Sequence, residues 1–240
     1  MAHPAAHEMA PGVWRIPAAP YDFVNVMAFV GDDGQVALVD CGLKGKGKRT
    51  LAGLAAMGKS VQDVTQIVLT HAHGDHAGGA ATLAALSGAP VSIHAVDAPW
   101  ARSGMAPPRD KSLVAGRVLN ALGRGANGFP PVTVAEEFAD GDVLPVAGGL
   151  RVVHTPGHTM GHVALLHEPT GVLVTGDSIW NVRRLKWSVR SFCQDVVMNE
   201  QTAHVLGELE YDVAAFTHGK HISRGAREQV RGFLRDAATR

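Results

Sequence analysis

Short apolar runs separated by turn residues fill the first part of the chain and predict a β-meander. The runs cover 13–16, 23–30 and 36–39, and a Gly-Asp-Asp-Gly turn at 31–34 joins the last two. Runs of this length, bounded by glycine and aspartate, are typical of strands. We therefore expect three successive strands at the start of the fold.

Beyond residue 40 the pattern alternates between helix and strand. We expect helices at 46–57 and 80–86, the second ending at Ser87-Gly88, and strands at 67–69 and 91–94. From residue 132 the predicted order is strands at 132–138, 150–154, 163–166 and 172–175, a helix at 201–209, a strand at 213–217 and a helix at 225–238. This alternation indicates an α/β (α+β) protein made of two similar halves, packed sheet to sheet with helices outside.

Residues 97–131 interrupt that rhythm with many prolines and glycines around one amphipathic helix, predicted over 111–122. Such an excursion is typical of a lid, a pocket wall or an interface, and a helix packed on the core is the alternative. We expect residues 1–240 to form a single domain with this helical insertion at about 97–131.

The charge balance argues against a strongly charged partner. Lys plus Arg number 22 and Asp plus Glu also number 22, so neither nucleic acid nor an anionic membrane is indicated. Arginines at 224, 227, 231 and 235 form a stripe at helical spacing, which a solvated helix face explains. We expect a small-molecule substrate and leave open whether the protein is a monomer or a homodimer.

The two cysteines, Cys41 and Cys193, cannot make a disulfide framework and have no CxxC spacing. Residues 1–20 lack a basic segment followed by an apolar core, and no apolar run approaches the roughly 18 residues that span a bilayer. A cytoplasmic location is therefore expected.

The stretch Thr70-His71-Ala72-His73-Gly74-Asp75-His76 places three imidazoles and a carboxylate directly after the strand predicted at 67–69. Imidazole is a preferred ligand for zinc and several other divalent metals. A polar loop that happens to be rich in histidine is the alternative.

Three more motifs follow apolar strands in the same way: Thr155-Pro156-Gly157-His158, Thr175-Gly176-Asp177 and Thr217-His218-Gly219. Loops at the ends of strands of one direction meet at one sheet edge. The resulting candidate ligands are His71, His73, Asp75, His76, His158, Asp177 and His218. Seven are too many for one tetrahedral zinc, but they suit two metals that share a bridging carboxylate.

These four motifs, in this order, resemble those of the metallo-β-lactamase fold superfamily. The resemblance implies a four-layer αββα sandwich, with the site at one edge of the sheets. It implies that His71, His73 and His158 bind one metal, that Asp75, His76 and His218 bind the other, and that Asp177 bridges both. Asp40 and His162 occupy positions that the family uses to support the ligands, although Asp40 can also cap the following helix.

The expected cofactors are two divalent metal ions per chain, with zinc first and iron or manganese also open. Two cations lower the pKa of a shared water, so that a hydroxide attacks a carbonyl carbon while the metals stabilise the developing charge. Asp75 and Asp177 are the residues expected to act in catalysis, Asp177 as the bridge and Asp75 as a candidate proton carrier.

The resemblance narrows the substrate to an ester, lactone or thioester. A β-lactamase of this superfamily has Cys or Ser where Asp177 stands, which argues against lactam hydrolysis. A glyoxalase II-type hydroxyacylglutathione thioesterase would need a basic patch, which Arg183, Arg184, Lys186 and Arg190 can supply. An iron-dependent oxidoreductase similar to a persulfide dioxygenase also stays open, as does a binding protein without activity.

Aromatic and apolar residues outside the motifs are candidates for the walls of a substrate pocket, with core packing as the alternative. These candidates are Trp100, Met105, Trp180, Trp187 and Phe192, and His221 is a further candidate for a substrate contact, with a surface position as its alternative. Their apolar character favours a hydrophobic ester or lactone over a glutathione thioester.

Overall fold

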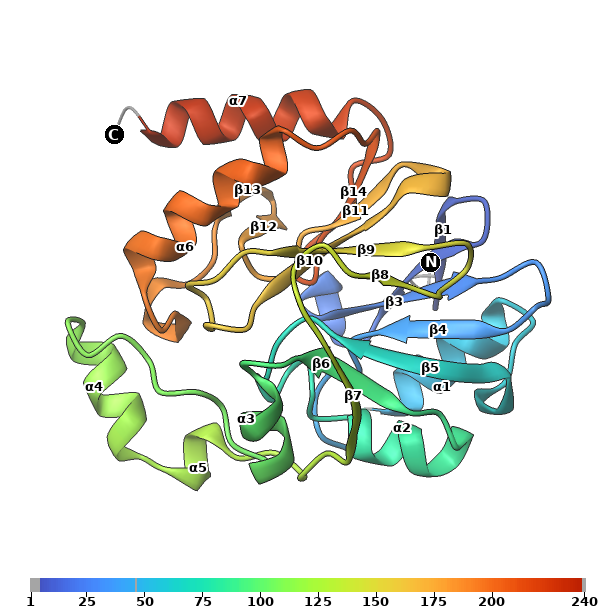
Figure 1. The fold of residues 1–240 in the computed structure, drawn as a ribbon, viewed down its shortest axis with the longest axis horizontal. Coiled ribbons are helices and arrows are strands. Elements are labelled where there is room, and N and C mark those ends of the chain that lie inside the picture. The colour runs from blue at the N-terminus through green and yellow to red at the C-terminus, as the bar shows by residue number, and fades with distance from the viewer. Residues whose placement is uncertain (1–4, 46, 239–240) are drawn as a thin grey trace.

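The fold has four layers, with two β-sheets packed face to face and helices on both outer faces (Figure 1). The computed structural model describes residues 5–45 and 47–238. The αββα sandwich expected from the sequence is confirmed.

Sheet I has seven strands in the order of the chain. They are β1 (His7–Ala10), β2 (Val13–Pro17), β3 (Asn25–Val30), β4 (Val36–Val39), β5 (Val64–Leu69), β6 (Val91–His94) and β7 (Val134–Phe138). The first four strands pair antiparallel, and β4 to β7 pair parallel. This change of direction is what the predicted meander followed by α/β alternation requires.

Sheet II has five strands in the order β14-β11-β10-β9-β8. They are β8 (Val143–Leu144), β9 (Leu150–His154), β10 (Val163–His167), β11 (Val172–Val174) and β14 (Val213–Ala215). A separate hairpin joins β12 (Ile179–Val182) to β13 (Arg184–Trp187). Only β11 and β14 pair parallel within sheet II.

Helices cover both outer faces. On sheet I lie α1 (Gly47–Ala56), α2 (Ala80–Ser87) and α3 (Ala98–Ser103), and on sheet II lie α6 (Val196–Thr202) and α7 (Ala226–Ala238). Short 3₁₀ segments occur at Pro20–Asp22, Val61–Asp63, Glu168–Thr170, Arg190–Phe192 and Ala203–Gly207. Within the described residues, no helix has the length and apolar character needed to cross a membrane.

Three apolar layers hold the sandwich together. The middle layer lies between the sheets and includes Met27, Phe29 and Val68 from sheet I with Val152 and Leu165 from sheet II, all at most 1% exposed. Because β-strand side chains alternate between faces, each sheet supplies one row to this layer and another to its covering helices. The loops at the strand ends are thereby fixed to a rigid base.

The main error in the predicted elements concerns the helix at 201–209. In the structure α6 begins at Val196, where the Asp195 side chain accepts a hydrogen bond from the Met198 N–H at 2.8 Å, and residues 203–207 form a 3₁₀ turn. The cap starts the helix five residues earlier than the apolar spacing indicates. Strands β1, β8, β12 and β13 were not predicted, and Lys46, the first residue of the predicted helix at 46–57, lies outside the described residues.

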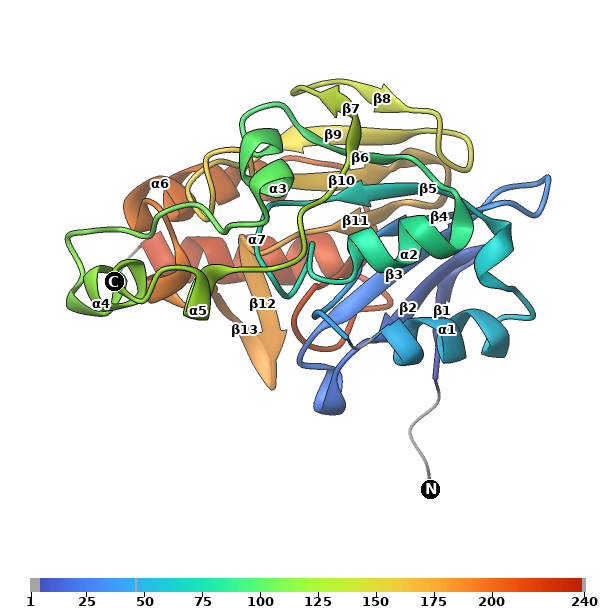
Figure 2. The ribbon, with the colours of Figure 1, turned by 90° about the horizontal axis from the view of Figure 1, so that it is seen from below.

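The insertion contains two more helices, α4 (Val114–Ala121) and α5 (Arg124–Asn127), which project beyond the sheets in both views (Figures 1 and 2). The apolar side predicted for residues 111–122 faces outward, since Val114, Val118 and Leu122 are 67%, 55% and 58% exposed. α4 is tied to the preceding loop by Asn120, which accepts a hydrogen bond from the Arg109 N–H and donates one to its carbonyl.

Asp97, at the start of α3, joins the two halves of the fold. Its fully buried carboxylate accepts hydrogen bonds from Ala72 N (2.9 Å) in the loop after β5, and from Thr159 Oγ1 (2.7 Å) and Gly161 N (2.9 Å) in the loop after β9. One carboxylate therefore fixes the relative position of two loops that come from different sheets. Burial raises the pKa of Asp97, which these three hydrogen bonds oppose.

Replacing Asp97 with Ala is expected to lower the free energy of unfolding by about 3 kcal/mol. The substitution leaves three buried donors without an acceptor, each worth ~1–3 kcal/mol. Urea denaturation of the variant beside Asp32→Ala, a change in the exposed β3–β4 turn, measures the difference. Equal stability of the two variants would show that Asp97 does not join the loops.

Candidate metal centre

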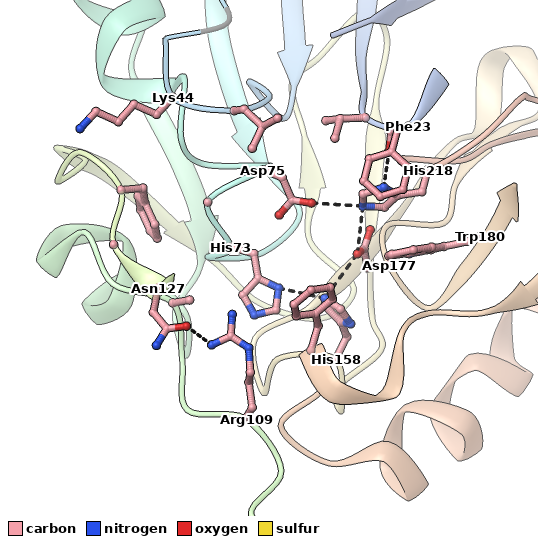
Figure 3. A pocket seen from close by; sticks show the side chains of 17 residues that line it. Phe23, Lys44, His73, Asp75, Arg109, Asn127, His158, Asp177, Trp180 and His218 are labelled. Carbon is pink, nitrogen blue, oxygen red and sulfur yellow. Dashed lines mark hydrogen bonds and ion pairs between the residues drawn. The ribbon is translucent and has the colours of Figure 1, made fainter. Parts of the chain in front are cut away.

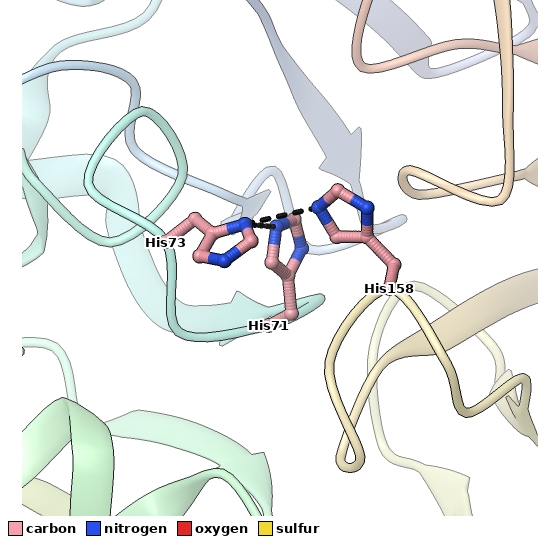
Figure 4. A group of neighbouring side chains, drawn as sticks. All are labelled: His71, His73 and His158. Carbon is pink, nitrogen blue, oxygen red and sulfur yellow. Dashed lines mark hydrogen bonds between the residues drawn. The ribbon is translucent and has the colours of Figure 1, made fainter. Parts of the chain in front are cut away.

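The loop after β5 and the loop after β9 bring three imidazoles together at one sheet edge. His71 Nε2 lies 3.1 Å from His73 Nδ1, which in turn lies 2.9 Å from His158 Nε2 (Figure 4). The three ring atoms face a common point. They form the group that the resemblance assigned to the first metal.

A second group adjoins the first. His218 Nε2, in the loop after β14, lies 3.4 Å from Asp75 Oδ2, and His76 Nε2 lies 3.7 Å from the same oxygen. The His218 ring lies between Trp180 and Phe23, with ring centroids at 4.0 and 5.5 Å. This is the group assigned to the second metal.

Asp177, which follows β11, lies between the two groups. Its Oδ1 is 3.4 Å from His76 Nε2, and its Oδ2 is 3.4 Å from His158 Nε2 and 3.3 Å from His218 Nε2 (Figure 3). A carboxylate that reaches both groups has the placement expected of a bridging ligand.

In four of the five histidines, the ring nitrogen that faces away from the site (the outer nitrogen) contacts a hydrogen-bond acceptor. His76 Nδ1 lies 2.8 Å from Asp40 Oδ2, His158 Nδ1 lies 3.3 Å from Ser188 Oγ, and His218 Nδ1 contacts the Phe23 carbonyl. His71 Nδ1 lies 3.1 Å from Thr70 Oγ1, whose proton points to Asp40. In these four rings the outer nitrogen donates a proton, so the inner nitrogen is the one that can bind a cation. The outer nitrogen of His73, Nε2, is buried without a hydrogen-bond partner.

Converging lone pairs are the observation that favours a cation. Nε2 of His76 and of His218 is buried without a hydrogen bond and lies 3.3–3.7 Å from the carboxylates of Asp75 and Asp177. This arrangement needs a positive charge between nitrogen and carboxylate, which a proton or a bound metal ion supplies. Nitrogen and carboxylate donors suit zinc, iron or manganese and do not choose among them. The residues present therefore fit two divalent ions.

Electrostatics divides the histidines into two kinds. Burial lowers the pKa of His71 and His158 well below the usual value, and that of His73 to about 3, which keeps these rings neutral. Burial also acts on His76 and His218, but nearby Asp177 and Asp75 outweigh it and raise the pKa of His218 to about 9.

The two carboxylates of the site are ionised. Burial raises the pKa of Asp75 and Asp177, but the adjacent histidines, among them His76 and His218, outweigh it and bring both well below the usual range. The site thus holds two carboxylates and three neutral nitrogen donors, from His71, His73 and His158. A metal ion that displaces the protons of His76 and His218 completes a donor set suited to cations.

Asp40 and His162 support the candidate ligands from behind. Asp40 accepts hydrogen bonds from Thr70 N and Oγ1 beside its contact with His76, and it has a left-handed φ of 61° at the end of β4. His162 Nε2 accepts a hydrogen bond from Asp177 N at 2.7 Å. Gly176 has a φ of +54°, and a Cβ there would lie 2.3 Å from His162 Nε2, so this motif requires glycine.

The candidate ligands open into a cavity of about 400 Å³ (Figure 3). Besides His73, Asp75, His158, Asp177 and His218, its lining includes Phe23, Val24, Leu43, Lys44, Ala106, Arg109, Asn127, Phe129, Trp180 and Phe192. A volume of this size is typical of small-molecule sites.

Of the six predicted pocket residues, Trp180 and Phe192 lie in this lining. Trp100 packs against the core of sheet I, and Trp187 packs against Phe233 of α7 with ring centroids at 4.9 Å. Met105 pairs through its backbone with Gly128, and His221 accepts a hydrogen bond from Arg15 Nε at 3.1 Å. Core and loop packing accounts for these four residues, and placing them in the pocket was wrong.

The sequence pattern did not identify several residues that shape the site. Arg109 follows Pro107-Pro108 in the insertion, where no motif marks it, and Phe23 falls within a run predicted as a strand. Asn25 donates hydrogen bonds to the carbonyls of Phe216 (2.9 Å) and Gly219 (2.7 Å), and so holds the His218 loop. A buried asparagine in a β-strand is a signal that could have been used.

Two further expectations concern residues near the hairpin. Arg184, Lys186 and Arg190 line a different hollow, beside Phe233 and Asp236, so the basic patch proposed for glutathione does not face the candidate metal centre. Cys193 Sγ lies 3.7 Å from the outer nitrogen of His158, behind the ring and not among the converging donors. Burial raises the pKa of its thiol to about 11.

Comparison with known proteins agrees with this geometry. A model of the metallo-beta-lactamase superfamily matches residues 20–218. In Bacillus subtilis, the uncharacterized protein YobT is 28% identical over 236 residues, covering 94% of this chain and 95% of that protein, and the probable metallo-hydrolase YybB is 27% identical, covering 81% and 80%.

A hydroxyacylglutathione hydrolase from Cereibacter sphaeroides is 36% identical over 126 residues, which are 52% of this chain but only 38% of that enzyme. Among solved structures, the metallo-beta-lactamase family protein TTHA1429 from Thermus thermophilus superposes with a TM-score of 0.73 at 27% identity, covering 97% of this chain and 81% of that one. The family model spans all four motifs and the whole candidate metal centre. The chain belongs to the metallo-beta-lactamase superfamily.

Proposed function

We propose that this protein is a dinuclear metal-dependent hydrolase that cleaves an ester, lactone or thioester bond of a small molecule, with zinc as the first candidate metal. The observation that carries the proposal is the convergence of two donor groups on Asp177 at the base of a cavity of about 400 Å³. Superfamily membership and hydrolase names among the relatives support the reaction class.

When bound, two such cations would supply Lewis acidity, activating a water and polarising the carbonyl of the substrate. The chain's own residues set the geometry. Thr217 Oγ1 donates a hydrogen bond to Asp177 Oδ1 at 2.6 Å and His162 holds its backbone, so the proposed bridging carboxylate has little freedom to move. Such preorganisation limits the reorganisation needed during the reaction.

Asp75 is the candidate for proton transfer to the leaving group. It is the most exposed of the seven candidate ligands, with 32% of its side-chain surface accessible, and it lines the cavity. Its remaining oxygen is thus available to a substrate group, while Phe23 and Trp180 pack around His218 and limit the access of water.

The walls of the cavity favour an apolar acyl or leaving group. The lining includes the apolar side chains of Phe23, Leu43, Phe129, Trp180 and Phe192. A hydrophobic ester or lactone therefore fits better than a glutathione thioester, because the basic residues Arg184, Lys186 and Arg190 line a different hollow.

Metal analysis of the purified protein tests the dinuclear site. We expect two divalent ions per chain in the wild type and about one in Asp177→Ala, with a fall in kcat/KM of at least about a hundredfold, because the shared carboxylate is lost. Elemental analysis and ester turnover are measured together, with Asp32→Ala as the control. Two tightly bound metals and full turnover in Asp177→Ala would rule out the bridging role.

A substrate panel tests the bond type. Zinc-loaded protein is expected to hydrolyse aryl esters or acyl-homoserine lactones faster than glutathione thioesters, because the cavity is apolar. Turnover of the thioesters alone would overturn this preference. One iron per chain without any ester or thioester turnover would instead favour an oxidoreductase.

Asp40→Asn tests the support of the second donor group. The amide fits the left-handed backbone at position 40, but it lacks the charge that holds the His76 ring in the tautomer with Nε2 free. We expect the affinity for the more weakly bound metal to fall by about 10–100-fold. Competition with a chelating dye measures this affinity, and an unchanged value would assign Asp40 a role in backbone structure only.

A further inference from the structure

Arg109 places a positive charge inside the cavity of the candidate metal centre. The side chain is 7% exposed, comes from the insertion and lies beside His73 (Figure 3). Its Nη1 donates to the Asn127 side chain, and its guanidinium carbon lies 5.5 Å from the centre of the Phe192 ring. Its backbone is held by the two hydrogen bonds with the Asn120 side chain.

The charge of Arg109 has no counterpart in the fold. Among residues 5–45 and 47–238, no carboxylate forms an ion pair with it, and its buried Nε has no hydrogen-bond partner. The two carboxylates in the cavity lining, Asp75 and Asp177, lie against the histidines instead. Burial lowers the pKa of Arg109 and Asp75 opposes this, but a guanidinium remains charged at neutral pH.

Burying an unpaired guanidinium is unfavourable for the free energy of folding, and packing contacts alone do not account for an arginine at this position. The contact with Phe192 and the bond to Asn127 need a flat side chain with one donor, whereas Arg109 has four further N–H groups and a full charge. A ligand that supplies an anionic, planar acceptor would satisfy the fork of the guanidinium. Lys44, exposed at the rim of the same cavity, adds a second positive charge on the approach.

We propose that Arg109 binds a carboxylate that the substrate carries a short carbon chain away from the bond to be cleaved, so that the preferred substrate is an acidic ester, lactone or thioester with an otherwise apolar body. The reaction of this substrate rests on the proposed function, whereas the binding of a carboxylate by Arg109 does not. Asn127 orients the guanidinium, and the insertion thereby sets specificity. Because the carboxylate is single and lies within a few bonds of the reacting carbonyl, it differs from the two carboxylates of glutathione, which lie farther from the thioester.

A matched pair of esters tests the subsite through turnover. Mono-4-nitrophenyl glutarate and 4-nitrophenyl pentanoate share the leaving group and chain length and differ in one carboxylate. We expect the zinc-loaded wild type to favour the glutarate ester by about tenfold or more in kcat/KM, because charge-assisted hydrogen bonds contribute ~1.5–3 kcal/mol. In Arg109→Gln the ratio of the two values should fall toward one, and Arg109→Lys should keep part of it.

The control is Arg102→Gln. Arg102 lies in the same insertion but pairs with Glu137 at 2.6 Å and does not line the cavity. The ratio in this variant should equal that of the wild type. A ratio that falls equally in Arg102→Gln and Arg109→Gln would reveal a general charge effect and overturn the subsite, as would a ratio unchanged in Arg109→Gln.

Calorimetry with non-reacting ligands separates the subsite from the reaction. A metal centre can bind one carboxylate of either glutarate or pentanoate, so only the second carboxylate of glutarate reports on Arg109. We expect zinc-loaded wild type to bind glutarate about tenfold more tightly than pentanoate, and Arg109→Gln to lose that difference while keeping its melting temperature within a few degrees.

The two experiments fail in different ways. Absence of turnover for both esters contradicts the proposed function, while a preference for glutarate that depends on Arg109 still supports the subsite. Equal binding of glutarate and pentanoate by the wild type overturns the subsite whatever the turnover.

Discussion

The structure depends on the convergence of buried nitrogen and oxygen donors from four strand-end loops. Two ionised carboxylates and several neutral imidazoles face one another within hydrogen-bonding or ion-pair distance, and all of these residues except Asp75 are buried. Such a group is unfavourable on its own and favourable around cations. This burial of converging donors underlies three features of the site: the proposed metal-dependent chemistry, the low pKa of His73, and the polar contacts that hold the imidazole rings from behind.

That support is distributed over both halves of the sandwich. Asp97 joins the loops after β5 and β9, and Asp40 fixes both Thr70 and His76. Asn25 holds the loop that carries His218. Each of these polar groups is buried and makes hydrogen bonds. The same hydrogen bonds therefore stabilise the fold and position the candidate ligands. The insertion, by contrast, leaves the apolar side of α4 exposed and contributes one charged side chain, Arg109, to the cavity.

The motifs made the fold and the group of seven ligand-type residues predictable, because each follows an apolar strand whose end is fixed by the sheet. Periodicity could not place Trp100, Trp187 or His221, since an aromatic side chain in a loop suits the core as well as a cavity. Arg109 and Asp97 escaped notice because their roles arise from contacts between segments far apart in sequence. The start of α6 was missed because one capping carboxylate outweighs the apolar spacing.

The most direct test of the central claim is a crystal structure of zinc-loaded protein with anomalous data collected at the zinc edge. The account predicts two anomalous peaks per chain, one enclosed by His71, His73 and His158 and the other by Asp75, His76 and His218, with Asp177 between them. A single peak, or peaks away from Asp177, would contradict it.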